Sequence, residues 1–343
     1  GGGGGGPGAP PAGAGAVARA LENAARLAVA DLDGVQIDLR VYDTAGNAAT
    51  AAAQAQQAVD AGAKIILGPL FGEAANAVGV QVADDNVNVL SFSNNPSIAG
   101  GNVFVLGPTF RNTADRLMGF AARQGKQSVT VVYPDNVEGQ FGKGAIEAAA
   151  GANGVRVVAA EGFDFSQQGV IAAMPRIAAA ARQSDAVFLT SNAAGALPLL
   201  VQLLPENGIS PDATQYIGLA RWDVPAQTLS LPGVQGGWFA LPDQTRTANF
   251  ASRYQGAYGT APHPLAGLGF DGIAAIGALV GAGKSDALTA TALTQSSGFQ
   301  GTGGIFRLRA DGTNERALAV ATVRDNKVVI LDPAPNRFGT AGF

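Results

Sequence analysis

A repeated alternation of short apolar runs with helix-forming segments constrains the fold of this chain more than any other feature. Residues 64–73 show one unit of it. Ile65–Leu67 is a continuous apolar run, which is typical of a parallel strand covered on both faces. Gly68-Pro69 ends the strand, because proline cannot continue it. Glu73 then lies in the first turn of a predicted helix, where the helix dipole favours an acid.

The same alternation extends over most of the chain. Strands are predicted at 35–42, 65–67, 87–92, 103–106, 128–133, 155–161, 186–190, 215–218 and 238–240. Helices are predicted at 17–31, 47–61, 73–83, 113–124, 141–152, 170–182, 195–204, 247–258 and 265–282. The rhythm breaks near Gly107-Pro108 and then restarts, which predicts two α/β lobes with parallel sheets and right-handed crossovers. The tail, 304–331, reads as hairpin strands with turns at Asp311-Gly312 and Asp325-Asn326.

Composition excludes several classes of protein. The 343 residues are 47% hydrophobic and 14% charged with a net charge of −4, so a large core is expected and a nucleic-acid-binding surface is not. The absence of cysteine excludes disulfides and thiolate sites, and His263 as the one histidine excludes a histidine-rich metal site. No apolar run approaches the roughly 20 residues of a membrane helix. No signal peptide is recognisable, so we expect a chain that is cytoplasmic or already processed.

The first 16 residues are nearly all glycine, alanine and proline. Such a stretch has little surface to bury and much entropy to lose, so it is expected to be a flexible tail. A glycine-rich stretch before a helix can cradle a phosphate, but that motif needs a preceding strand, and none is present.

Several motifs, taken in order, resemble type I periplasmic binding proteins of the leucine-binding kind. They are Leu21–Ala28, Val41–Thr44, Ile66–Leu70, Val89–Ser93, Val132–Asp135, Ala186–Phe188 and Phe270–Ala275. Within that superfamily the chain is most similar to the penicillin-binding-protein activator lipoproteins. Gly68–Phe71, Ser91–Asn95 and Arg221–Asp223 carry this closer match.

The resemblance implies two Rossmann-like lobes with parallel sheets flanked by helices and a ligand cleft between them. Lobe one would comprise 17–109 and 242–298, lobe two 110–241 and 299–343, with chain crossings near 107–112, 238–243 and 296–303. Family members begin with an apolar strand at the centre of the first sheet. Here the glycine-rich stretch occupies that place, so the first sheet is predicted to lack its central strand.

Candidate ligand-binding residues follow the strands, because ligands gather at the carboxyl ends of parallel strands. They are Phe71, Gly72, Glu73, Ser93, Asn94 and Asn95 in lobe one and Glu138, Ser191, Asn192, Arg221 and Trp222 in lobe two; the resemblance adds Asp271. Each has a plainer interpretation. Asn94-Asn95 could cap its own loop, Arg221 could pair with Asp223 above a packed Trp222, and Asp271 could cap a turn.

The resemblance also indicates a departure in ligand chemistry. Amino-acid-binding relatives hold the ligand carboxylate with a serine after the 65–67 strand and an alanine–threonine pair after the next. This chain has Gly72-Glu73 and Asn94-Asn95 in those places. Since an added acid repels a carboxylate, a plain aliphatic amino acid is not the expected ligand.

Two functions remain open at this point, and neither is enzymatic. One is a periplasmic binding protein that closes on a small polar solute and delivers it to a membrane importer. The other is a protein-binding activator of a peptidoglycan synthase, possessing the same fold. The expected location is periplasmic, with a lipid anchor as one possibility. No cofactor or metal is implied, and a nucleotide-dependent enzyme is disfavoured because no glycine fingerprint follows a strand.

Overall fold

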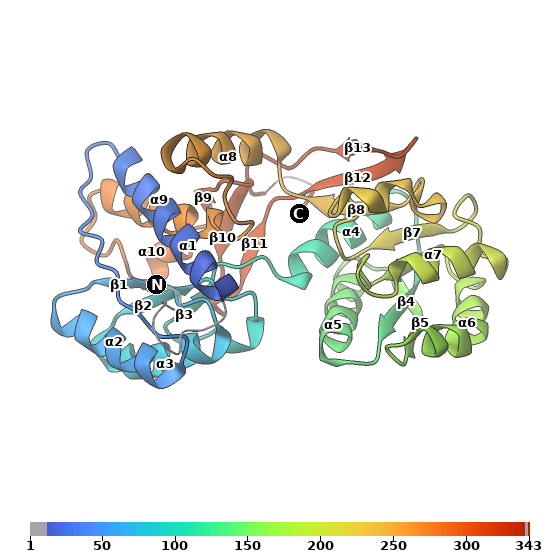
Figure 1. The fold of residues 1–343 in the computed structure, drawn as a ribbon, viewed down its shortest axis with the longest axis horizontal. Coiled ribbons are helices and arrows are strands. Elements are labelled where there is room, and N and C mark those ends of the chain that lie inside the picture. The colour runs from blue at the N-terminus through green and yellow to red at the C-terminus, as the bar shows by residue number, and fades with distance from the viewer. Residues whose placement is uncertain (1–11, 340–341) are drawn as a thin grey trace. The chain divides into compact units, whose positions relative to one another are not determined.

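The computed structural model describes residues 12–339 and 342–343, which form two compact units (Figure 1). Among them, unit 1 contains the residues up to Thr109, Gln244–Ala317 and Asn336–Gly339. Unit 2 contains Phe110–Asp243, Leu318–Pro335 and the last two residues. The architecture is α/β in both units. Residues 299–317 differ from the expectation, since they belong to unit 1 and not to the second lobe.

Unit 1 is built on a three-stranded parallel sheet in the order β1-β2-β3. The strands are β1 (Ile65–Leu67), β2 (Asn88–Ser91) and β3 (Val103–Val105). The helices are α1 (Ala12–Asp31), α2 (Ala48–Asp60), α3 (Gly72–Val82), α8 (Gln244–Tyr258), α9 (Gly267–Gly281) and α10 (Ala290–Leu293), with short 3-10 turns η1 (Ala83–Asp85) and η2 (Pro96–Ile98). Figure 1 shows α2 and α3 on one side of this sheet and α1 and α9 on the other.

Two apolar clusters cover the faces of this sheet. Val78, Val82 and Val89 join the small residues of α2 and α3 in one cluster. Leu21 and Leu279, from α1 and α9, pack with the strands in the other. Because both faces are covered, β1 and β3 are wholly apolar and β2 is apolar at its centre, Val89-Leu90.

A second sheet completes unit 1. It is antiparallel, in the order β11-β10-β9, with β9 (Phe299–Gln300), β10 (Ile305–Leu308) and β11 (Asn314–Arg316). The Asp311-Gly312 turn joins β10 to β11, and Gly312 has a φ of 86° there, which favours glycine. The 304–331 tail is therefore not one hairpin system: its first strand joins this sheet, and its last two strands belong to unit 2.

The strand predicted at 35–42 is not formed. Its apolar positions alternate as expected, with Val35, Ile37 and Leu39 half-buried between exposed neighbours. Yet in the described part of the chain residues 33–43 make no backbone-to-backbone hydrogen bond. Period-two alternation indicates a chain that buries one face, but a strand also needs a neighbour to pair with.

The helix predicted at 17–31 begins earlier than expected. Residues 12–16 are part of α1 and not of a tail, because alanine and glycine run on into a helix that is covered by α9. The rest of the predicted tail, residues 1–11, lies outside the described residues.

Unit 2 is a seven-stranded sheet in the order β13-β12-β8-β7-β6-β4-β5. Its strands are β4 (Ser128–Pro134), β5 (Arg156–Phe163), β6 (Ala186–Leu189), β7 (Gln215–Gly218), β8 (Trp238–Leu241), β12 (Ala319–Arg324) and β13 (Lys327–Asp332). Its helices are α4 (Phe110–Arg123), α5 (Val137–Ala152), α6 (Gln167–Ala181) and α7 (Leu197–Glu206), with 3-10 turns η3 (Ala226–Ser230) and η4 (Pro232–Val234). The strands β4 to β8 pair in parallel, whereas β12 and β13 pair antiparallel.

Alternation along β6 shows how the sheet of unit 2 is covered. Ala186 and Phe188 pack towards α4 and α5, and Val187 and Leu189 pack towards α6 and α7. The predicted turn at Asp325-Asn326 joins β12 to β13 with positive φ at both residues, as a tight hairpin turn requires. Among the described residues, no helix is both long and apolar enough to cross a membrane.

Candidate functional site

In unit 1 the structure brings the residues after β1 and those after β2 together. A side chain added at Gly72 would lie 3.6 Å from both the Ser93 hydroxyl and the Asn95 amide. Gly72 opens α3, and Phe71 and Glu73 beside it are exposed. The predicted set Phe71, Gly72, Glu73, Ser93, Asn94 and Asn95 therefore forms one surface at the carboxyl edge of the sheet.

Not all of these groups remain available to a ligand. The Ser93 hydroxyl accepts the Asn95 backbone N–H at 3.0 Å, and the Asn95 side-chain oxygen Oδ1 accepts from the Ser97 hydroxyl at 2.7 Å. Asn95 thus caps its own loop, which was the plainer interpretation. Asn94 is exposed, and its amide makes no hydrogen bond within the described chain, so Asn94 and the exposed Glu73 remain accessible at this surface.

Asp271 does not join that surface. It is 1% exposed in α9, and its carboxylate accepts the Thr302 backbone N–H at 2.7 Å. Its other oxygen lies 3.5 Å from the Arg316 guanidinium, which also donates to the carbonyl of Leu106. Burial raises the pKa of Asp271, and the charge of Arg316 opposes that rise. The pair supports the connection between β11 and the end of β3 and does not line a ligand surface.

In unit 2 the residues after β4 begin a helix. The Asn136 side chain accepts the Gly139 N–H at 2.8 Å and so caps α5. Helix α5 therefore begins at Val137, one turn before the predicted start at residue 141. Glu138 lies exposed in that first turn and has no ion pair among the described residues, so its carboxylate is available.

The end of β6 presents a hydroxyl with no partner. Ser191 is 6% exposed, and within the described chain its hydroxyl makes no hydrogen bond; the Thr190 hydroxyl beside it is likewise unpaired. A buried polar group without a partner lowers stability by about 1–3 kcal/mol. Proteins often contain such groups where a ligand or another bound species supplies the missing hydrogen-bond partner. Asn192, by contrast, is exposed, and its side-chain oxygen Oδ1 accepts the Gly195 N–H at 2.9 Å.

The residues after β7 follow the plainer interpretation, in which Arg221 pairs with Asp223 and Trp222 is packed in the core. Arg221 forms two parallel hydrogen bonds to Asp223, at 2.9 and 2.6 Å. Trp222 is fully buried and packs against Gly218 and Gly237. Its ring is therefore part of the core, and Arg221 already holds a carboxylate.

Exposed apolar side chains surround the same edge of unit 2, and they are not among the residues predicted from the sequence. They are Val137 (72% exposed), Phe141 (52%), Phe165 (62%) and Val224 (59%). They belong to the segments that follow β4, β5 and β7, and the ring of Phe165 lies 3.5 Å from the side-chain position of Gly195. The spacing of Val137 and Phe141, four residues apart at a helix start, could have indicated this patch.

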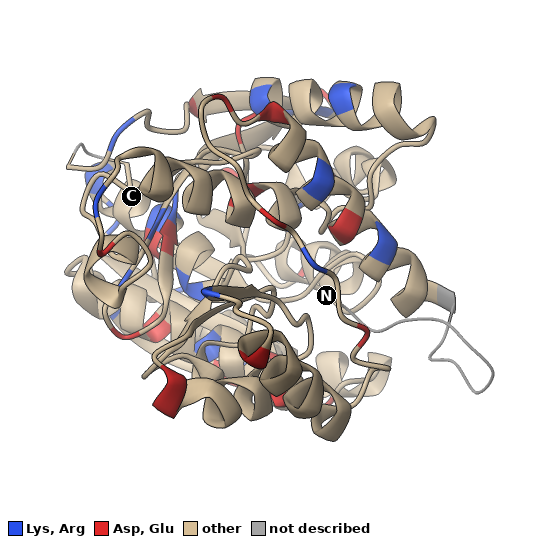
Figure 2. Ribbon diagram, turned by 90° about the vertical axis from the view of Figure 1, so that its left-hand side faces the viewer, with Lys and Arg blue, Asp and Glu red and all other residues tan. Residues whose placement is uncertain are grey.

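The charged residues of the described chain are mixed in sign and are not grouped around a metal site. Figure 2 shows positive and negative residues interspersed over the face in view, without a stretch of one sign. In the described part of the chain no three His, Cys, Asp or Glu residues are grouped so as to hold a metal ion. His263 accepts the Leu265 N–H through Nδ1, a local turn contact.

Comparison with known proteins identifies a family for this chain. A model of the family described as "Periplasmic binding protein" matches residues 10–327. A comparison with curated proteins gives no match.

Solved structures share the fold. A putative branched-chain amino acid ABC transporter protein from Rhodospirillum rubrum has a TM-score of 0.76 at 21% identity, over 92% of this chain and 96% of that one. A branched-chain amino acid ABC transporter periplasmic ligand-binding protein from Burkholderia xenovorans has 0.70 at 19%, over 93% and 91%. An ABC transporter substrate-binding protein from Desulfitobacterium hafniense in complex with Leu has 0.64 at 20%, over 91% and 95%.

The fold is thus that of type I, leucine-binding-like proteins, as the sequence motifs indicate. Since the family model spans most of the sequence, the chain belongs to the periplasmic binding protein family.

Proposed function

We propose that this protein is the solute-binding component of an ABC importer and acts in the periplasm. Its family and its fold relatives support this role. One observation supports solute binding at a particular residue: the buried hydroxyl of Ser191, at the end of β6, has no hydrogen-bond partner among the described residues. A solute oxygen or amine would satisfy it at the edge where parallel-sheet proteins bind ligands.

The exposed groups favour a polar solute that donates hydrogen bonds. Glu73 and Glu138 are carboxylates in the first turns of α3 and α5, and Asn94 offers both a donor and an acceptor. These carboxylates attract amines and hydroxyls and repel the carboxylate of an acidic solute. We therefore propose an amine- or hydroxyl-bearing solute in preference to a simple carboxylic acid. The candidate contacts within unit 1 are Glu73 and Asn94, and those within unit 2 are Glu138 and Ser191.

A screen of solutes by thermal shift, followed by calorimetry, tests the proposal. Amino acids, amines, polyols, peptides and cell-wall fragments would be compared, and a solute at a hundred times its Kd should add about 2.7 kcal/mol to stability. Asn94→Ala should then weaken binding about five- to tenfold, the value of one hydrogen bond. The control is Gln81→Ala, another exposed amide of unit 1, which pairs with Gln56 and should leave Kd unchanged. If no solute in the screen raises the stability, the proposal fails.

The exposed apolar patch of unit 2 favours a second candidate, a protein-binding activator of a peptidoglycan synthase. Clustered exposed apolar side chains are typical of interaction surfaces. The double substitution Val137→Ser and Phe141→Ser should then abolish binding to the periplasmic domain of a synthase. The control Val80→Ser removes an equally exposed apolar side chain from α3 and should not change binding. Equal binding by both variants would exclude this candidate.

A further inference from the structure

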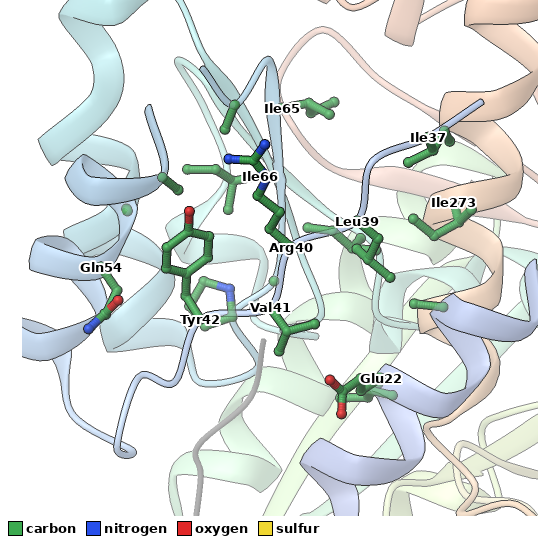
Figure 3. Close-up of a pocket in the computed structure, with 18 of the residues that line it drawn as sticks. Glu22, Ile37, Leu39, Arg40, Val41, Tyr42, Gln54, Ile65, Ile66 and Ile273 are labelled. Atoms are coloured by element: carbon green, nitrogen blue, oxygen red, sulfur yellow. The ribbon is translucent and has the colours of Figure 1, made fainter. Parts of the chain in front are cut away.

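A hollow in unit 1 and a hollow in unit 2 differ in the chemistry of their walls. The first, of about 810 Å³, lies beside β1, and Figure 3 shows apolar side chains that line it, among them Ile37, Leu39 and Ile273. The second, which we call the unit 2 hollow, has a volume of about 600 Å³. Polar and aromatic side chains line it, namely those of Arg123, Gln124, Trp238, Thr322, Arg324 and Asp332.

The unit 2 hollow lies at the amino end of β8. Gly236, which lines it, precedes β8, and the Gly236 N–H donates to the Val323 carbonyl at 2.7 Å. Ser191 follows the carboxyl end of β6, and β6, β7 and β8 pair in parallel. The carboxyl ends of parallel strands meet at one edge of a sheet, so the hollow and Ser191 lie at opposite edges. The hollow is thus separate from the proposed solute contacts of unit 2.

Two buried hydrogen-bond donors of the hollow have no partner. Trp238 is 7% exposed and Thr322 is 3% exposed, and the two residues lie directly opposite each other on β8 and β12. Opposite residues point to the same face of a sheet, and here the Phe120 ring of α4 packs on that face, 4.9 Å from the Trp238 ring. Within the described chain neither the Trp238 indole N–H nor the Thr322 hydroxyl makes a hydrogen bond, and neither group is fully enclosed. Both are therefore available to a ligand in the hollow.

Two arginines give the hollow a positive charge. Arg324 lies two residues after Thr322 and so points to the same face of β12; it is exposed and makes no ion pair within the described chain. Arg123 ends α4, and its guanidinium lies 3.7 Å from the Asp332 carboxylate. The charge of Asp332 is already matched by the buried Arg116, at 2.9 Å. The positive charges of the hollow therefore exceed the negative one, although the whole chain has a net charge of −4.

Hydrogen bonds fix the hairpin that supplies Arg324. The Gln235 side chain accepts the Asn326 backbone N–H and donates to the Asn326 side-chain oxygen, both at 3.1 Å. These bonds join the turn between β12 and β13 to the segment that precedes β8. A site whose backbone is already ordered loses less entropy when a ligand binds.

The donors of the hollow determine which ligand fits it. Indole and guanidinium groups only donate hydrogen bonds, so the ligand must accept them. One guanidinium suffices to hold a planar carboxylate, as Arg221 holds Asp223 in this chain. A phosphate monoester has oxygens in several directions, suited to donors on α4, β8 and β12 together, and a charge of about −2 that matches two arginines. We propose that the unit 2 hollow binds a phosphate group, either of a small anion or of a lipid headgroup.

Titrations of the full chain with three phosphate sources test this inference. The sources are inorganic phosphate, glycerol 3-phosphate and phosphatidylcholine vesicles that contain phosphatidic acid. Acetate and vesicles of phosphatidylcholine alone are the matched controls, and one ionic strength is used throughout because salt screens surface charges. Calorimetry gives Kd, and the fluorescence of Trp238 reports the site, since the other tryptophan, Trp222, is fully buried.

The protein should bind a phosphate source saturably and should bind acetate at least about tenfold more weakly. Arg324→Gln should weaken phosphate binding about tenfold, because it removes a charge-assisted hydrogen bond. Thr322→Val keeps the side-chain shape but removes the hydroxyl, so it should weaken binding about fivefold without lowering the thermal unfolding midpoint. The control Arg156→Gln removes an exposed arginine that has no ion pair in the described chain, on the far end strand β5, and should leave Kd unchanged.

Binding of the soluble phosphates alone assigns the site to a small anion, and binding of the phosphatidic acid vesicles alone assigns it to a lipid headgroup. Either result supports the inference if Arg324→Gln weakens the binding. Three results would overturn it: no saturable binding of any source, equal binding of acetate, or equal weakening by Arg324→Gln and Arg156→Gln. None of these variants changes a candidate solute contact, so the proposed import function is tested separately.

Discussion

The buried pair of Asp271 and Arg316 gives the sharpest prediction from this structure. Asp271 is 1% exposed, and the Arg316 side chain is 12% exposed. Asp271 is one of the ligand-binding candidates of the sequence analysis, but its partners are the Thr302 N–H and Arg316. Substitution of Asp271 should therefore change stability and leave solute binding unchanged.

The expected magnitude follows from what each substitution leaves behind. Asp271→Asn retains an acceptor for Thr302 but leaves the Arg316 charge buried without its counter-ion, which costs about 3 kcal/mol. The guanidinium still donates to the Leu106 carbonyl and lies 4.9 Å from the Phe306 ring, so the cost should be at the lower end of the range for broken buried pairs. Replacing both residues, as Asp271→Leu with Arg316→Met, should recover most of the loss.

The partner substitution adds a dependence on pH. In Arg316→Met the Asp271 carboxyl loses the charge that opposes its raised pKa, so its pKa in the folded state rises further. The folded state then holds a proton that the unfolded state releases above about pH 4. Stability should fall as pH rises, by up to about 1.4 kcal/mol per pH unit, until the pH passes the folded pKa.

Urea unfolding followed by far-UV circular dichroism measures these free energies. Both tryptophans, Trp222 and Trp238, belong to unit 2, so their fluorescence reports that unit separately. Asp84→Asn, an exposed aspartate without an ion pair in the described chain, is the control and should cost less than about 0.5 kcal/mol. If Asp271→Asn costs less than about 1 kcal/mol, or if Arg316→Met shows no pH slope, the assignment of a structural pair is wrong.

Four further substitutions have defined outcomes. Gly139→Ala would place its new Cβ 1.9 Å from a backbone carbonyl at the end of β4 and should cost more than about 2 kcal/mol in urea unfolding, whereas Gly144→Ala in the same helix meets nothing within 4 Å and should stabilise by about 0.5–1 kcal/mol. Ser191→Ala removes a buried unpaired hydroxyl, so thermal stability should stay equal or rise while solute affinity falls; a fall in both would contradict its proposed role. Glu315 has two arginine partners that, against the effect of burial, hold its pKa below the usual 4.5. Glu315→Gln should therefore lower the free energy of unfolding by about 1 kcal/mol at neutral pH, and this difference from the unsubstituted protein should disappear as the pH falls below the lowered pKa of the folded state. A difference in stability that persists in acid would exclude this charge effect.

The sequence by itself determined the order and type of most elements. Continuous apolar runs such as Ile65–Leu67 can be buried only between two layers of helices, so the strand-and-helix rhythm predicts the α/β class. Local turn chemistry was equally readable: Asn47 caps α2 as its position before the alanine-rich segment indicates, and Asp325-Asn326 forms the hairpin turn. These features depend on neighbours within a few residues.

Only the tertiary structure decided which segments pair and which side chains remain accessible. Residues 35–42 carry the alternation of a strand, but pairing depends on a neighbour that no local pattern specifies. The strand at 305–308 pairs with β9 and β11, which belong to the same unit. Asp271 belongs to a predicted helix and Trp222 follows a predicted strand. Only packing shows that Asp271 is held in a buried ion pair and that Trp222 belongs to the core. Burial is a property of what surrounds a side chain in space, and the sequence around it does not record that.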